Sequence, residues 1–327
     1  MPSQLDSRKI LLFGAGGVGA VYLFILAKGG ADVTAVCRSN YSAAKENGFT
    51  IESAIWGTFT VKPAVFASVS DAAAAGPYDF IVICSKAYVG VSPSTAELIK
   101  PAVGPDTAIV LCQNGIGIET EYASMYPSNV LISGVVYLPV TQTHPGHIVH
   151  GDLEQLEIGT YPASANSPVV SNFAAIYTAG GGSISVHDDV QERRWTKLIT
   201  NAAWNPICAL SQCADADFLR TSPESVTIVR RAMLEVVAVA RAKGYTEITE
   251  KTAEWQLSRA LGRLKTKGKE PSMLTDVRQG RHKAMEVELI VGNAMRIARE
   301  VGVETPTLDT IYAVSYTHLT LPTKRIV

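Results

Sequence analysis

The stretch KILLFGAGGVG at residues 9–19 decides the fold of the first half of the chain. Lys9 to Phe13 read as a short buried strand, and Ala20 to Lys28 read as an apolar helix. The turn between them has the pattern G-x-G-x-x-G and consists of Gly14, Ala15, Gly16, Gly17, Val18 and Gly19. A strand, a glycine turn and a helix in this order form a dinucleotide site, in which the pyrophosphate lies at the helix N-terminus. We therefore expect all six turn residues to contact a dinucleotide cofactor.

Each glycine of the motif has a separate physical role. Gly14 permits the tight turn, and Gly16 lets the backbone approach a pyrophosphate. Gly19 lets the helix pack closely on the strand.

The end of the second strand predicts which dinucleotide binds. Asp32 to Cys37 form this strand, and Arg38 follows it, with Ser39 and Asn40 beside it. NAD enzymes usually place an acidic residue here to hold the ribose 2′-hydroxyl, whereas an arginine suits a 2′-phosphate. Arg38 therefore favours NADP(H), and the alternative is an ordinary surface arginine.

The rest of the first half continues to alternate strands and helices, as a parallel sheet requires. A strand pair is expected around Gly57, and further strands are expected at 79–84, 108–112, 131–140, 147–153, 156–159 and 183–186. Ligands of such sheets bind beyond the carboxyl ends of the strands. Lys86 and Asn114 follow two of these strands, so we expect them where nicotinamide and substrate meet. The alternative is that both are turn residues without a role.

From Asp189 onward the chain has long helical periodicity. Helices are expected at 226–243, ended by Gly244, and at 282–301, closed by Gly302. The predicted fold class is α/β, with an N-terminal Rossmann-type dinucleotide-binding domain at 1–188 and an all-helical C-terminal domain at 189–314.

The first helix of this second half carries the stretch KLITNAAWNP at residues 197–206. Lys197, Asn201 and Asn205 recur every four residues and form one polar row among apolar neighbours. A lysine with two amides suits a small oxo acid, because it offers a proton donor and two hydrogen-bonding groups. The alternative is a solvated helix face. Pro206 predicts a kink or a helix end at this point.

Composition and charge exclude several classes of function. The formal net charge is −1, so no basic surface for nucleic acid is expected. We expect no membrane span, since no apolar run is long enough, and no signal peptide. The 5 cysteines lack metal or redox spacing, which favours a reduced, cytoplasmic protein. His144, His147 and His150 suggest a metal site, but a turn separates the first two and the last two fall on opposite faces of a strand, so we expect no metal.

Six motifs, taken together, resemble the ketopantoate reductase family. They are GAGGVG at 14–19, SKAY at 85–88, QNG at 113–115, RWTKLITNAAWNP at 194–206, PSM at 271–273 and MEVELIVG at 285–292. The resemblance runs from about residue 9 to 314, and K-x-x-x-N-x-x-x-N-P is its specific part. It implies NADPH-dependent reduction of 2-dehydropantoate to pantoate, a reaction of pantothenate biosynthesis.

The resemblance also implies a role for each site residue. Lys197 is the general acid, and Glu286 positions it and contacts the cofactor. Substrate-binding residues are Asn114, Asn201, Asn205 and Ser272; Lys86 and Asn114 also belong to the cofactor site. Burial and a second lysine nearby would draw the pKa of Lys197 toward neutrality.

Some residues depart from the family pattern. These differences bear on which substrate is bound more than on the type of reaction. Val287 and Glu288 alter the surroundings of Glu286, and Asp215 stands in a stretch where the family often has an asparagine. Two alternatives stay open: a paralogue that reduces another 2-oxo acid, ketone or imine, and a non-catalytic NADP(H)-sensing protein.

The end of the chain does not continue the expected final helix. The segment YTHLTLPTKR at 316–325 resembles translated adapter sequence, so we interpret residues 315–327 as a non-native tail. The helical half offers a face for a homodimer, and the expected partner is otherwise a small-molecule substrate.

Overall fold

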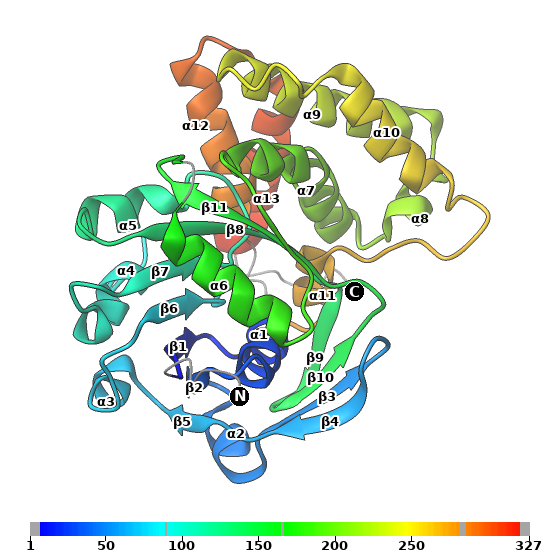
Figure 1. Ribbon diagram of the computed structural model, residues 1–327. Helices are drawn as coiled ribbons and strands as arrows, with labels where there is room; N and C mark the ends of the chain where they lie inside the picture. Colours follow the sequence, from blue (N-terminus) through cyan, green and yellow to red (C-terminus); the bar gives the residue numbers. More distant parts are fainter. Residues whose placement is uncertain (1–6, 89, 165–166, 281–285, 321–327) are drawn as a thin grey trace. The chain divides into compact units, whose positions relative to one another are not determined.

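The computed structural model describes residues 7–88, 90–164, 167–280 and 286–320, with side chains up to 317 (Figure 1). The chain forms two compact units. The first contains the residues up to Gln113 together with Ile118–Val190. The second contains Asn114–Gly117 and the residues from Gln191 onward. A short segment of the first half of the sequence therefore belongs to the second unit.

The first unit is built on an 8-stranded sheet of order β12-β11-β8-β7-β6-β1-β2-β5. Its strands are β1 (Lys9–Phe13), β2 (Asp32–Val36), β5 (Ala64–Phe66), β6 (Phe80–Ile83), β7 (Ala108–Leu111), β8 (Leu131–Tyr137), β11 (Gln155–Tyr161) and β12 (Ile184–Val186). Neighbours from β8 to β5 are parallel, and β11 is antiparallel to β8. The central strands β6 and β7 are buried throughout, as expected for parallel strands covered on both faces.

A second, 4-stranded sheet belongs to the same unit and has the order β4-β3-β10-β9. Its strands are β3 (Phe49–Ser53), β4 (Gly57–Val61), β9 (Val140–His144) and β10 (His147–His150). The predicted strand pair around Gly57 is confirmed as the β3–β4 hairpin, and Gly57 has a φ of +74°. The strand expected at 131–140 is instead divided between β8 of the main sheet and β9 of this one.

Helix α1 (Gly17–Lys28) contacts strands of both sheets. It therefore has apolar neighbours on opposite sides, which explains why its sequence has no polar face. The helix begins at Gly17, inside the glycine motif, rather than at Ala20. The other helices of the unit are α2 (Tyr41–Asn47), α3 (Val69–Ala73), α4 (Thr95–Ile99), η1 (Lys100–Ala102), α5 (Glu119–Met125) and α6 (Pro168–Ala179).

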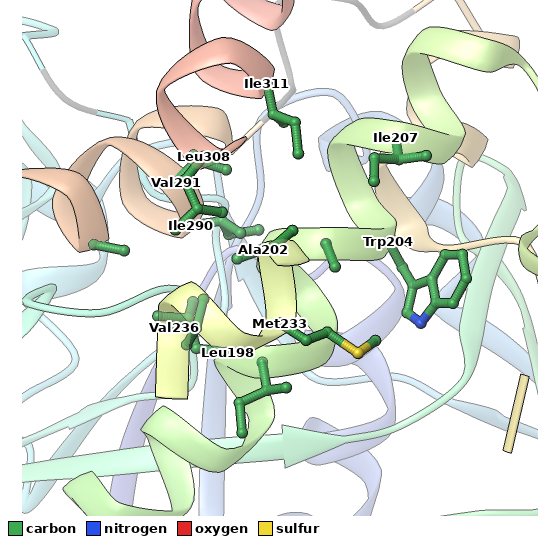
Figure 2. Close-up of a cluster of buried hydrophobic side chains, with 14 of the residues drawn as sticks. Leu198, Ala202, Trp204, Ile207, Met233, Val236, Ile290, Val291, Leu308 and Ile311 are labelled. Carbon is green, nitrogen blue, oxygen red and sulfur yellow. The ribbon is translucent and has the colours of Figure 1, made fainter. Parts of the chain in front are cut away.

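The second unit is helical. Its elements are α7 (Gln191–Ser211), α8 (Asp215–Leu219), α9 (Pro223–Ala242), α10 (Glu250–Leu261), α11 (Ser272–Arg278), the π-helix η3 (Glu288–Gly292), α12 (Asn293–Glu300) and α13 (Pro306–Thr320). Helix α7 lies at the centre and contacts α8, α9, α10, α11, α13 and η3. Figure 2 shows part of this core, where Leu198 and Ala202 of α7 lie among Met233, Val236 and Ile290.

Three helix predictions need correction. Of the two outcomes predicted at Pro206, the helix end is wrong, because α7 continues past the missing N–H donor, and the kink stays a prediction. The helix expected at 282–301 contains a π-helical turn before α12, and residues 281–285 lie outside the described part. Helix α13 continues to Thr320, past the point where the sequence predicted that it would stop.

The predicted fold class is confirmed: an α/β unit with a parallel sheet is followed by a helical one. Among the helices described, not one has both the length and the apolar character that crossing a membrane requires.

Candidate active site

The glycine turn leads from β1 into α1 and leaves room where a phosphate would approach. Gly14 has a φ of +93°, and a Cβ there would lie 2.4 Å from the backbone N of Ser85. A Cβ on Gly19 would lie 2.4 Å from the carbonyl O of Gly14. In contrast, the nearest atom to a Cβ on Gly16 would be Oε1 of Gln142, at 4.0 Å. The turn and the packing thus require Gly14 and Gly19, whereas the space at Gly16 suits a ligand.

A residue of the second sheet, Gln142, helps to hold this turn through Asn40. Asn40 donates from Nδ2 to the carbonyl O of Ala15 at 2.8 Å and exchanges two hydrogen bonds with the side-chain amide of Gln142 on β9. Asn40 is buried, and its side chain holds the backbone of the glycine turn. No sequence pattern marked Gln142, which lies 102 positions from Asn40.

A cavity of ≈ 360 Å³ lies beside the ends of β1 and β2. Phe13, Val36, Arg38, Tyr88 and Ser92 are among its lining residues. The Arg38 guanidinium lies over the Phe13 ring, 5.9 Å from the centroid. Apolar walls, one cation and a volume in the range of small-ligand sites fit a nucleoside that carries a phosphate.

The other residues predicted to bind the cofactor are divided between the two units. Val18 is half-buried in α1, and Lys86 is half-buried in the segment that follows β6. Asn114 and Glu286 belong to the second unit.

Lys197 lies on α7, and its Nζ donates to Oδ1 of Asn114 at 2.8 Å. Burial is the larger cause and the charge of Arg194 the smaller one in lowering the pKa of Lys197 to about 7. The Glu286 carboxylate acts in the opposite direction and raises it. The expected shift of the pKa toward neutrality is therefore found, but the neighbouring cation within this unit is Arg194, and not a lysine.

The backbone on both sides of Asn114 is held by the helical unit. Gly115 has a φ of +102°, and a Cβ there would lie 2.6 Å from the carbonyl O of Leu289. The N–H of Ile116 donates to that same carbonyl at 2.9 Å, and Nδ2 of Asn293 donates to the carbonyl O of Ile116 at 2.6 Å. Leu289 belongs to the π-helical turn, and such turns are frequent at functional sites.

Arg194 also contacts this segment, and sequence reasoning missed it. Its side chain donates from an Nη atom to the carbonyl O of Gly115 at 3.0 Å. The residue is 3% exposed. An arginine three positions before a polar row reads as a surface charge, and its contact comes from a segment that only the fold brings near.

The other predicted residues lie on three elements of the second unit. Asn201 is half-buried and Asn205 is buried, both on α7, so the alternative of a solvated helix face is wrong for this row. Glu286 is 7% exposed and precedes η3. Ser272 is the exposed first residue of α11. Lys197 thus contacts Asn114 and feels the charge of Glu286, while the place of Ser272 in the site stays a prediction.

The negative charge of the Asp215 carboxylate is paired within the second unit. It forms an ion pair with Arg263 and accepts hydrogen bonds from the N–H groups of Ala216 at 2.6 Å and Lys269 at 2.7 Å. Its role in the unit is to hold the start of α8 against the loop before α11.

The histidines of the second sheet have structural partners. His147 lies 3.0 Å from the Glu52 carboxylate, while His150 contacts Ser53 Oγ at 2.9 Å and stacks on Trp56. Across the residues that can be searched, His, Cys, Asp and Glu form no group of three that could hold a metal ion.

The glycine turn on a parallel sheet, followed by a helical unit with a half-buried lysine whose pKa is lowered, defines a dinucleotide-dependent oxidoreductase. Family comparison agrees: residues 10–163 match the model of Ketopantoate reductase PanE/ApbA, and residues 189–317 match its C-terminal model. The chain belongs to the ketopantoate reductase family.

Individual relatives cover almost the whole chain. An uncharacterized protein of Saccharomyces cerevisiae is 32% identical over 93% of this chain and 91% of its own length. The 2-dehydropantoate 2-reductase of a Nostoc species is 30% identical over 94% of each chain. The crystal structure of 2-dehydropantoate 2-reductase from Methylococcus capsulatus has a TM-score of 0.82 and 36% identity, covering 94% of this chain and 96% of its own.

Proposed function

We propose that the protein reduces a 2-oxo acid to a 2-hydroxy acid with NADPH, and that 2-dehydropantoate is the substrate. The observation that carries the proposal is the Lys197 amine, held 2.8 Å from Asn114 with a pKa of about 7. An acid with a pKa near neutrality is matched to proton transfer at physiological pH. Membership of the ketopantoate reductase family supports the choice of substrate.

The reaction adds a hydride to the carbonyl carbon and a proton to its oxygen. The bound nicotinamide supplies the hydride. The Lys197 ammonium stabilises the negative charge that develops on the oxygen and then gives that oxygen its proton. Asn114 accepts a hydrogen bond from the amine and so fixes the direction in which it points. The Glu286 carboxylate favours the protonated amine.

Asn201, Asn205 and Ser272 are the residues we assign to the substrate. The two asparagines offer amide donors and acceptors on the α7 face of Lys197, and Ser272 offers a hydroxyl for the carboxylate. A paralogue acting on another 2-oxo acid, ketone or imine would keep Lys197 and differ in these contacts.

Arg38 supports NADP(H) rather than NAD(H). Its guanidinium lines the cavity at the end of β2, where a 2′-phosphate would lie. The glycine turn from Gly14 to Gly19 would hold the pyrophosphate, with Lys86 on the nicotinamide side. We also propose a cytoplasmic location, and a homodimer stays a prediction.

NADPH oxidation tests the proposal at steady state, with ketopantoate beside a panel of 2-oxo acids and cyclic imines. Strong preference for ketopantoate is the expected result. Turnover with the other compounds only would contradict the substrate and favour the paralogue. Tight NADPH binding without turnover of any compound would contradict the activity and favour an NADP(H)-sensing protein.

A further inference from the structure

Arg194 is a buried cation on helix α7 of the helical unit. Its guanidinium has almost no exposed surface, and it donates to the Gly115 carbonyl at 3.0 Å. A buried charge is costly unless it is paired or hydrogen-bonded, so its presence close to the half-buried Lys197 calls for a specific role.

The contacts of Arg194 and Lys197 converge on consecutive residues. Arg194 holds the carbonyl of Gly115, while Lys197 donates to the side chain of Asn114. Both donors come from α7 and lie three positions apart, so they share one face of the helix. The other side of the segment is fixed by the bond from Ile116 to Leu289. Asn114 is therefore held between α7 and the π-helical turn.

We propose that Arg194 is a positioning residue, which anchors the Gly115 carbonyl and thereby holds Asn114 in the orientation that aims the Lys197 amine at the substrate. This inference rests on the proposed function, in which Lys197 is the general acid. Arg194 itself touches neither substrate nor cofactor in this account.

The charge of Arg194 has a second effect on the same amine. Arg194 lowers the pKa of Lys197, and Glu286 raises it; both are among the charged groups that act on this lysine. A lysine at position 194 would supply a similar charge but not the planar fork that reaches the carbonyl in a fixed direction. The two effects of Arg194 can therefore be separated by substitution.

Arg194→Gln removes the charge, and Arg194→Lys keeps it while disturbing the anchor. Arg193→Gln is the control, because it removes a neighbouring charge that is exposed and screened by solvent. The measurement that needs no substrate is an NMR titration of protein labelled at lysine ¹³Cε. The Lys197 signal is assigned by its loss in Lys197→Met.

We expect the Lys197 titration to move up by roughly one pH unit in Arg194→Gln and to stay in place in Arg194→Lys and Arg193→Gln. In steady-state assays, Arg194→Lys should lower kcat by about tenfold with the pH profile unmoved, since the acid keeps its pKa but loses its orientation. A merely structural role would lower the melting temperature and leave both the titration and kcat unchanged.

The inference is overturned if Arg194→Lys keeps the wild-type kcat, and this holds even where Arg194→Gln does not fold. It is also overturned if folded Arg194→Gln titrates like the wild type. Failure of the proposed function has a different signature: the wild type would show no turnover of any carbonyl, while the titrations could still be compared.

Discussion

The Nζ atom of Lys197 lies 2.8 Å from Oδ1 of Asn114, although the two residues are 83 positions apart in sequence. Asn114–Gly117 group with the helical unit and not with the sheet that they follow. The residue after a strand of the dinucleotide-binding unit thus orients the proposed acid on α7.

The rate of reduction should fall as the pH rises through about 7, because the acid must be protonated and the Lys197 pKa lies there. The reverse reaction, oxidation of the 2-hydroxy acid, needs the neutral amine and should gain rate over the same range. The logarithm of kcat/KM plotted against pH in both directions checks this. A reduction rate that stays constant to pH 9 would contradict the assignment of Lys197.

Glu286→Gln should move the descending limb of the reduction profile to lower pH. The carboxylate raises the pKa of Lys197, so its removal leaves burial and Arg194 to lower that pKa further. Glu288→Gln is the matched control. Glu288 is also a glutamate near the start of η3, but its carboxylate pairs with Arg296 at 2.9 Å. A limb that moves in the control and not in Glu286→Gln would refute the role of Glu286.

Gly16→Ala and Gly19→Ala should fail in different ways. A Cβ at position 19 would lie 2.4 Å from the Gly14 carbonyl, so that variant should lose several degrees in melting temperature. A Cβ at position 16 meets nothing closer than 4.0 Å, so the fold should persist. NADPH binding to Gly16→Ala should still weaken by roughly tenfold or more. Calorimetric melting and titration with NADPH separate the two effects, and unaltered affinity in Gly16→Ala would rule out the pyrophosphate site.

Arg38→Ala should weaken binding of NADPH and leave binding of NADH nearly unchanged, since only the former has a 2′-phosphate for the guanidinium. We expect KM for NADPH to rise by about tenfold. Arg8→Ala, on the same unit, is a suitable control for general effects of charge, because Arg8 pairs with Asp79 at 2.7 Å. Equal losses for both cofactors would place the 2′-phosphate elsewhere.

Local patterns were sufficient to predict most of the fold. The glycine motif marked β1 and α1, and runs of apolar residues marked the buried strands such as β6 and β7. The second sheet could not be predicted in this way, because β3 and β10 are joined across nearly a hundred residues. The helix end predicted as one outcome at Pro206 was wrong because tertiary packing around α7 keeps a helix that local propensity disfavours.

The candidate site was predicted in part, for a related reason. The four-residue spacing of Lys197, Asn201 and Asn205 could be recognised because one helix carries them all. Arg194 and Asn293 could not be recognised in this way. Each belongs to the site because its side chain donates to a backbone carbonyl, that of Gly115 or Ile116, far away in the sequence. Spacing along the chain predicts side chains on one face of a helix, but not which distant carbonyl they meet.

The most direct test of the central claim compares wild type and Lys197→Ala in NADPH oxidation with ketopantoate at pH 6.5, with NADPH affinity measured in parallel. We expect turnover by the wild type and a fall in kcat of about 10²–10⁴-fold in the variant, at unchanged affinity for NADPH. Lys251→Ala, an exposed position on α10, should behave like the wild type. Equal kcat values for the wild type and Lys197→Ala would contradict the account.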